Sequence, residues 1–163
     1  MKKNKIIIAF AILTMALTIL TGCATDPIDT DLTNYYENQI PALTELENSV
    51  MTAFNSVVEE NFVDDPTLIS KLKNDVIPNS NNLVEQSKAV TTETEELKAI
   101  HEKFTASLVT ENSAFTTMLE GLENRDKDLV TKGNDLLTES HVQFQAFSTA
   151  LDALAKEHGW VDK

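Results

Sequence analysis

The amino-acid sequence predicts an all-α fold, an antiparallel up-down-up-down four-helix bundle with long helices. Three observations lead to this prediction. Apolar residues recur at steps of three and four along almost the whole chain after residue 30, which is the spacing of one helix face. Strand-like alternation is absent, and Gly and Pro number only 4 each in 163 residues. Four such segments joined by short turns pack most simply as antiparallel neighbours.

The first helix is expected over residues 31–61, with a kink near Pro41. Proline has no N–H and its ring clashes with the preceding turn, so the helix should bend or stop near Gln39 or Ile40. The apolar face of this helix consists of Leu32, Tyr36, Ile40, Leu43, Leu46, Val50, Ala53 and Val57.

The second helix is expected from Pro66 to about Val90. Asp65 is a suitable N-cap residue and Pro66 suits the first helical position. Pro78 and the following "NSNN" have low helix propensity, so a break is open there. The apolar face consists of Ile69, Leu72, Val76, Leu83 and Val90.

The third helix is expected to end near Glu123. Thr92 and Glu95 have the spacing of a capping box just before its first apolar residue. Glu111 interrupts the apolar face and is interpreted as a residue at the edge of the face whose carboxylate reaches water. The remaining members of this face are Leu97, Ile100, Phe104, Leu108, Phe115, Met118 and Leu122.

The fourth helix is expected to end at His158-Gly159, because glycine suits the left-handed position after a helix. Trp160 and Val161 would then fold back onto the last turn. A turn near Asn124 and Arg125 would place this helix antiparallel to the third. Its apolar face consists of Leu129 or Val130, then Gly133, Leu137, Ser140, Phe144, Phe147, Leu151 and Leu154.

The N-terminus has the pattern of a secretory signal peptide, with lysines at the start and an uncharged apolar run from Ile6 to Leu20. Leu20-Thr21-Gly22-Cys23 resembles the lipobox of bacterial lipoproteins. That resemblance implies cleavage between Gly22 and Cys23, a diacylglycerol on the Cys23 sulfur and an N-acyl chain as a further option. The expected segments are a signal peptide at 1–22, the lipidated cysteine with a polar tether at 23–30, and a helical bundle domain at 31–163. The alternative is an uncleaved anchor with an incidental cysteine.

The remaining chain is strongly acidic. Removal of residues 1–22 leaves 10 Lys and Arg against 26 Asp and Glu, a net charge of −16. Nucleic acids and anionic headgroups are bound by basic patches, so the composition excludes both as ligands. Cys23 is the only cysteine, so the domain is expected to be stable without a disulfide.

No catalytic residue and no metal site are predicted. The Glu-x-x-His motif of di-iron bundles is absent before His101, His141 and His158. In the expected hairpin His101 and His141 are about 10 Å apart along the axis, so a shared metal is not expected. Haem ligation by one histidine stays an alternative. Nucleophile-elbow, phosphate-loop, zinc and calcium-loop patterns are also absent.

Two ends of the bundle are distinguished by their side chains. Tyr35, Tyr36 and Trp160 are expected together at the membrane-proximal end, where they contact headgroups or pack at the base of the bundle. The other end is expected to form an acidic tip that either binds divalent cations or a basic partner, or serves only for capping and solvation. Its acidic residues are Glu59, Glu60, Asp64, Asp65, Asp126 and Asp128.

The sequence therefore predicts a lipoprotein anchored to the extracytoplasmic face of the cell membrane and acting as a non-catalytic interaction or structural module. Its long helices and acidic composition resemble small helical cell-wall-binding lipoproteins of Gram-positive bacteria. The expected partners are membrane lipid through the anchor and an envelope protein or wall component, with no cofactor beyond the covalent lipid. The alternatives are a bundle that binds a small ligand or metal ion, and a phage-exclusion or immunity lipoprotein.

Overall fold

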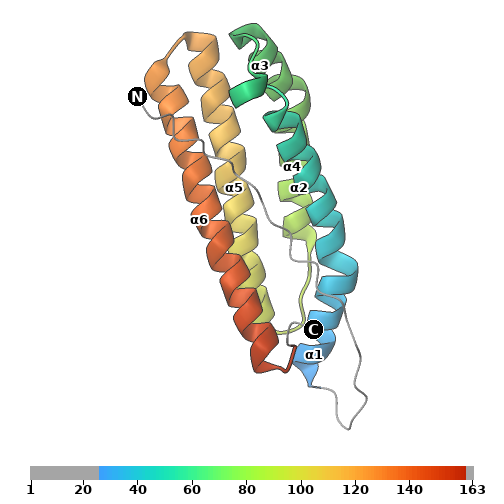
Figure 1. The fold of residues 1–163 in the computed structure, drawn as a ribbon. Coiled ribbons are helices and arrows are strands. Elements are labelled where there is room, and N and C mark those ends of the chain that lie inside the picture. The colour runs from blue at the N-terminus through green and yellow to red at the C-terminus, as the bar shows by residue number, and fades with distance from the viewer. Residues whose placement is uncertain (1–25, 161–163) are drawn as a thin grey trace.

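The computed structural model describes residues 26–160, and these residues form an all-α bundle of four long helical rods (Figure 1). The first rod contains α1 (Pro27–Asn34), the π-helix η1 (Tyr35–Gln39) and α2 (Ile40–Asn55). A short 3-10 helix, η2 (Glu59–Asn61), lies in the turn that follows. The all-α prediction is confirmed. Residues 1–25 and 161–163, which include the predicted signal peptide, Cys23 and Val161, lie outside the described part of the chain.

The second rod contains α3 (Asp65–Lys71), the π-helix η3 (Leu72–Val76) and α4 (Ile77–Ala89). The third rod is α5 (Glu95–Asn124) and the fourth is α6 (Lys127–Glu157). Figure 1 shows the α2–α3 and α5–α6 turns at one end of the bundle, and α1 with the end of α6 at the other. We call the first of these ends the tip and the second the base.

A π turn precedes each of the two prolines inside a rod, Pro41 and Pro78. The N–H of Ile40 bonds to the carbonyl of Tyr35, and the N–H of Ile77 bonds to the carbonyl of Leu72. Both are five-residue spacings, and each is followed at once by Pro41 or Pro78. The wider turn moves the preceding carbonyl away from the proline ring, so both rods continue where a break was possible.

The first rod differs from the expected helix 31–61 at both ends. It begins at Pro27, inside the expected tether, because the Asp26 carboxylate caps the N–H of Ile28 and proline suits the first turn. It ends at Asn55, because the Ser56 hydroxyl donates a hydrogen bond to the carbonyl of Ala53 and the backbone of Val58 is extended. The predicted end at residue 61 is therefore wrong.

The expected apolar face of the first rod is confirmed at Leu32, Leu43, Val50 and Val57, which are buried, and is displaced by one position at three other places. Tyr35, Glu47 and Phe54 are buried, whereas the adjacent Tyr36, Leu46 and Ala53 are only partly buried. The core members expected on the second, third and fourth helices agree more closely with the structure. The buried ones among them are Leu72, Val76, Leu83, Leu97, Ile100, Phe104, Leu108, Phe115, Met118, Leu137, Phe147, Leu151 and Leu154.

The third and fourth rods pack in the antiparallel register that the predicted turn gives. The Ser140 hydroxyl donates to the carbonyl of Ser107 at 3.0 Å, and the rings of Phe104 and Phe147 are 4.9 Å apart. Gly133 allows this close approach, since a Cβ there would lie 3.0 Å from the carbonyl oxygen of Ala114. Arg125 in the turn adopts φ 56, the left-handed conformation that ends α5.

The helix ends show two corrections and one confirmation. The N-cap of α3 is Asp64, not Asp65, with its carboxylate 2.8 Å from the N–H of Thr67. The capping box of Thr92 and Glu95 is not formed. At the end of α6, Gly159 has φ 78 and the N–H of Trp160 bonds to the carbonyl of Ala155 at 2.8 Å, as the His158-Gly159 prediction requires.

Candidate functional site

The predicted lipidation site lies just before the described chain. Gly22 and Cys23 fall outside the described residues, and Asp26, the first described residue, lies at the base of the bundle (Figure 1). Between residues 26 and 160, every helix is too short or too polar to cross a bilayer.

The base joins the start of the first rod to the end of the fourth. His158 Nδ1 lies 2.8 Å from the Asp26 carboxylate, and the rings of Tyr36 and Trp160 are stacked with centroids 5.6 Å apart. Tyr36 and Trp160 therefore meet at the base, and Trp160 folds back onto the bundle as predicted. Tyr35 is fully buried and has no access to a membrane surface.

Within the described chain, one group of side chains has the composition of a metal site. Asp26, Asp29 and His158 each offer a ligand atom, and these atoms lie within 4.8 Å of one another. This group could not be predicted from local spacing, because His158 is 132 residues from Asp26 along the chain. Asp26 and His158 also form a hydrogen bond at the N-terminus of α1, where a carboxylate is stabilised by the helix dipole.

His101 is a buried histidine, 6% exposed, whose two ring nitrogens both have protein partners. Nε2 lies 2.8 Å from the carbonyl oxygen of Ser87, which can only accept, so Nε2 carries the hydrogen. Nδ1 therefore accepts from the Tyr35 hydroxyl at 2.8 Å. Burial lowers the pKa of His101 and keeps the ring neutral.

This arrangement also speaks against a catalytic dyad. The Ser87 hydroxyl lies 3.4 Å from His101 Nε2, but that nitrogen already donates its hydrogen to a carbonyl and has no lone pair to accept a proton. The hydroxyl instead bonds to that of Thr105 at 2.7 Å. The same occupancy of both ring nitrogens leaves His101 no free atom for haem iron.

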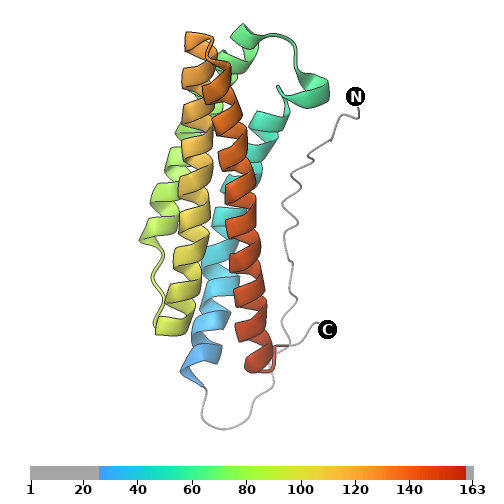
Figure 2. The ribbon, with the colours of Figure 1, turned by 90° about the vertical axis from the view of Figure 1, so that its left-hand side faces the viewer.

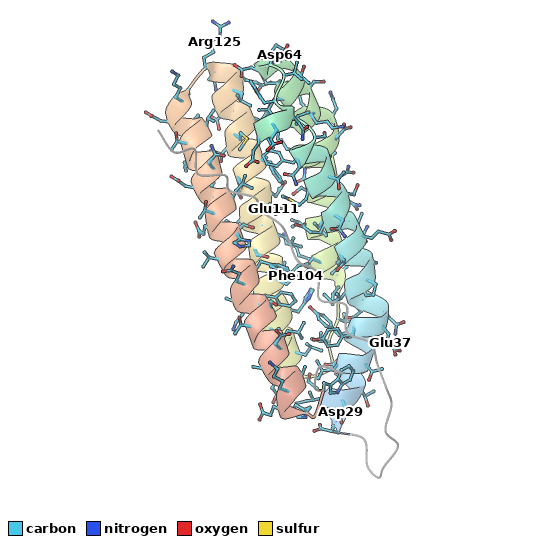
Figure 3. The ribbon with its side chains drawn as sticks, in the orientation of Figure 1. Asp29, Glu37, Asp64, Phe104, Glu111 and Arg125 are labelled. Atoms are coloured by element: carbon cyan, nitrogen blue, oxygen red, sulfur yellow. The ribbon has the colours of Figure 1, made fainter. Side chains whose placement is uncertain are left out.

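Two glutamates face each other inside the bundle. Glu47 on α2 and Glu111 on α5 are 4% and 2% exposed, so the interpretation of Glu111 as a water-exposed edge residue is wrong. Figure 3 shows Glu111 midway along the bundle, between the rods. Glu47 Oε1 and Oε2 and Glu111 Oε1 have no other hydrogen-bonding partner. Two ionised carboxylates contain no donor, so a shared proton is needed to link them.

The environment of the pair favours the protonated form. Burial raises the pKa of Glu47 to about 7, although its hydrogen bond with Glu111 opposes that shift. Burial, followed by the negative charge of Glu47, raises the pKa of Glu111 well above its ordinary value. While the pair carries a proton, a hydrogen bond between the two carboxyl groups joins the first and third rods. When both carboxyl groups are ionised, they repel each other.

A third buried acid holds the connection before α5. Asp31 on α1 accepts hydrogen bonds from the N–H groups of Glu93 and Thr94 at 3.0 and 2.8 Å, and from the Thr94 hydroxyl at 2.6 Å. These donors lie just before the first turn of α5 and have no acceptor within that helix. The contact spans more than 60 residues, and it holds Thr94, the N-cap residue of α5, against α1.

At the tip, part of the predicted acidic cluster serves for capping. Asp64 caps α3, and the Asp126 carboxylate accepts from the N–H groups of Asp128 and Leu129. The capping interpretation is therefore confirmed for Asp64 and Asp126. Figure 3 shows Asp64 and Arg125 at this end, far from Asp29 at the base.

The α2–α3 turn also exposes apolar side chains, which the acidic composition of this segment did not indicate. All residues from 59 to 67 are exposed, and they include Phe62 at 47% and Val63 at 73%. Figure 2 shows this turn projecting sideways from the tip of the bundle. An open depression of about 630 Å³ lies beside it, lined in part by the hydroxyl groups of Ser56, Thr67 and Ser70.

Comparison of the chain with protein families, with curated proteins and with solved structures finds no match.

Proposed function

We propose that the chain is a membrane-anchored extracytoplasmic lipoprotein, held by a lipid on Cys23, that acts through contacts with other components of the cell envelope. The observation that carries this proposal is the short distance along the chain between Cys23 and the first helix, which begins at Pro27. Four residues reach at most about 14 Å. A lipid on Cys23 would therefore hold the base of the bundle close to the bilayer.

The shape of the bundle supports the same proposal. α6 has 31 residues and so extends about 46 Å, and α5 is nearly as long, with 30 residues. With the base beside the bilayer, the tip would be presented some tens of ångströms from the membrane. A rigid spacer of this kind suits contact with a partner in the envelope.

The finer topology is part of the proposal. We infer an antiparallel up-down-up-down four-helix bundle. The inference is supported by the Ser107–Ser140 and Phe104–Phe147 contacts and by the order of the rods in Figure 1.

Contact without catalysis is the mode of action that the buried groups favour. His101 donates and accepts within the protein, and the carboxyl groups of Glu47 and Glu111 face each other away from solvent. None of these groups lines the depression at the tip, so they serve the fold. The expected partner is an envelope protein or a wall component.

One observation favours the alternative, a bundle that binds a metal ion. The two carboxylates and the imidazole of Asp26, Asp29 and His158 converge at the base, and such mixed oxygen and nitrogen ligands suit zinc or manganese. Under this alternative, zinc raises the melting temperature of wild type and not of His158→Gln. A melting temperature unchanged by zinc, manganese and calcium leaves only the contact role.

The anchor is tested by substitution of Cys23. Cells that express wild type, Cys23→Ala or the control Thr25→Ala are grown with radioactive palmitate and then fractionated. We expect wild type and Thr25→Ala to carry label in the membrane fraction. We expect Cys23→Ala to be unlabelled and to be lost from the membrane fraction as a mature protein. Label on Cys23→Ala would overturn the proposed anchor.

A further inference from the structure

We propose that the α2–α3 turn, residues 56–67, is the surface by which this protein binds its partner, and that the partner is a protein with an apolar socket flanked by lysine or arginine. The proposal rests on the contact role proposed above and does not need the lipid anchor. Exposed apolar side chains, the charge of the first rod and the internal bonding of the turn support it independently.

The first observation is the pair of adjacent apolar side chains at the outermost part of the turn. Phe62 and Val63 are among the few large apolar residues exposed in the described chain. The chain enters the core again on both sides, at Val57 and Leu68, which are 8% and 6% exposed. Since covering a phenylalanine or valine side chain removes its apolar surface from water, a partner that covers both gains a substantial part of its affinity here.

The second observation is the charge around this pair. Residues 27–70 contain 9 Asp and Glu and no Lys or Arg. Glu59, Glu60, Asp64 and Asp65 are all exposed beside the apolar pair. Lys71, the first cation after the turn, forms an ion pair with Asp75 at 2.7 Å. Complementarity therefore favours a basic partner surface and disfavours an anionic bilayer.

The third observation is that the turn holds its own shape. The N–H of Asn61 bonds to the carbonyl of Val58 at 3.0 Å, and the Asn61 side chain bonds to the carbonyl of Asn55 at 2.9 Å. Asp64 caps the following helix. Glu59 adopts φ 52, a left-handed conformation that is uncommon for a residue other than glycine. A turn ordered in this way loses little conformational freedom when it binds.

The depression beside the turn completes the surface. Its hydroxyl-bearing lining provides polar groups next to an apolar protrusion, the arrangement of a protein interface with an apolar centre and a polar rim. A partner side chain that enters the depression would meet Ser56, Thr67 and Ser70, and the Asp64 carboxylate for a cation.

The test uses the full-length chain in detergent micelles and a phage-displayed library of random 12-residue peptides. Peptides selected on wild type are synthesised, and their affinities are measured for wild type, for the double variant Phe62→Ser/Val63→Ser and for the control Val142→Ser. Val142 is another exposed valine, 59% exposed and on α6, with an exposure between those of Phe62 and Val63. We expect selected peptides that combine Lys or Arg with an aromatic or aliphatic residue, bind the double variant at least tenfold more weakly, and bind the control unchanged.

Several results would overturn the proposal. These are selected peptides without basic residues, peptides that bind the double variant as well as wild type, and failure to select any peptide. Unchanged melting temperatures show that the double variant is folded. A lipid-binding turn is tested separately: flotation with phosphatidylcholine vesicles that the double substitution abolishes would replace the protein partner by a membrane. The Cys23 experiment is independent, so loss of the anchor and loss of this surface are distinguished.

Discussion

The hydroxyl of Tyr35 donates a hydrogen bond to Nδ1 of His101 at 2.8 Å, although the two residues are 66 positions apart in the sequence. Tyr35 lies in the π turn that precedes Pro41, and His101 in turn donates to the carbonyl of Ser87 at the end of the second rod. Three of the four rods are thus joined by one buried imidazole. Burial raises the pKa of Tyr35 and lowers that of His101, so both groups are neutral.

Tyr35→Phe is expected to destabilise the bundle by about 1–3 kcal/mol, because it leaves Nδ1 of a buried histidine without a donor. Tyr36→Phe is the matched control: the Tyr36 hydroxyl is buried without a partner, so its loss should be neutral. Urea unfolding of both variants measures the difference. Equal free energies of unfolding for the two variants would show that the Tyr35–His101 bond contributes nothing.

Because of the Glu47–Glu111 pair, we expect the free energy of unfolding to fall as pH rises. Because the folded-state pKa of Glu47 is raised from 4.5 to about 7 and that of Glu111 is also raised, the folded chain holds more protons than the unfolded chain above about pH 4.5. The stabilisation is complete below that pH and is lost as pH rises through about 7. His101 acts in the opposite sense, since its lowered pKa removes stability as pH falls below 6.5.

The variant Glu111→Gln distinguishes the contribution of the glutamate pair to the pH dependence of stability from that of His101. The neutral amide removes one titrating group, so the variant should be more stable than wild type at pH 8 and should lose less stability between pH 5 and 8. Glu120→Gln, at an exposed position on the same helix, should follow wild type. Melting temperatures across this pH range provide the measurement. A wild type whose stability rises steadily from pH 5 to 8 would contradict the protonated pair.

Asp31→Ala is expected to destabilise the bundle by about 3 kcal/mol or more, because three donors before α5 lose a charged acceptor. Amide hydrogen exchange should accelerate at Glu93 and Thr94 before the rest of α5. Glu37→Ala, an exposed position in the same rod, serves as the control and should change neither property. Unaltered exchange at Glu93 and Thr94 in Asp31→Ala would refute the role of this carboxylate.

Gly133→Ala is expected to destabilise the bundle by about 1–3 kcal/mol despite the higher helix propensity of alanine. The added methyl would lie 3.0 Å from the Ala114 carbonyl oxygen and 3.1 Å from Met118 Cβ, so α5 and α6 must separate. Asn134→Ala, at the exposed neighbouring position, should be neutral or slightly stabilising. Calorimetric melting of the pair measures this, and a stabilised Gly133→Ala would argue against close packing at this point.

Local patterns were sufficient to predict the rods and most of the core. Leu97, Phe104 and Phe115 recur at helical spacing and are buried, and Gly159 ends α6 as its lack of a Cβ allows. The position of the disturbance near Pro41 was also predictable, because the steric clash is local. Its form as a π turn was not, since a kink and a break were equally compatible with the sequence.

The buried polar groups could not be predicted, because each is satisfied by a residue on another rod. Glu111 stands on the apolar face of α5, but only its pairing with Glu47 explains its burial. Glu47 has helical spacing with Leu43 and Val50, a signal that could have placed it in the core. Asp31 accepts from Glu93 and Thr94, which lie more than 60 residues away and belong to the connection before α5. The exposure of Phe62 was not predicted, because the acidic residues around it indicated only a polar turn.

The most direct test of the proposed anchor is mass spectrometry of the N-terminal peptide from protein purified out of the membrane fraction. We expect residues 1–22 to be absent and Cys23 to be the first residue, carrying a diacylglycerol on its sulfur. An intact peptide that begins at Met1 and contains an unmodified Cys23 thiol would contradict it.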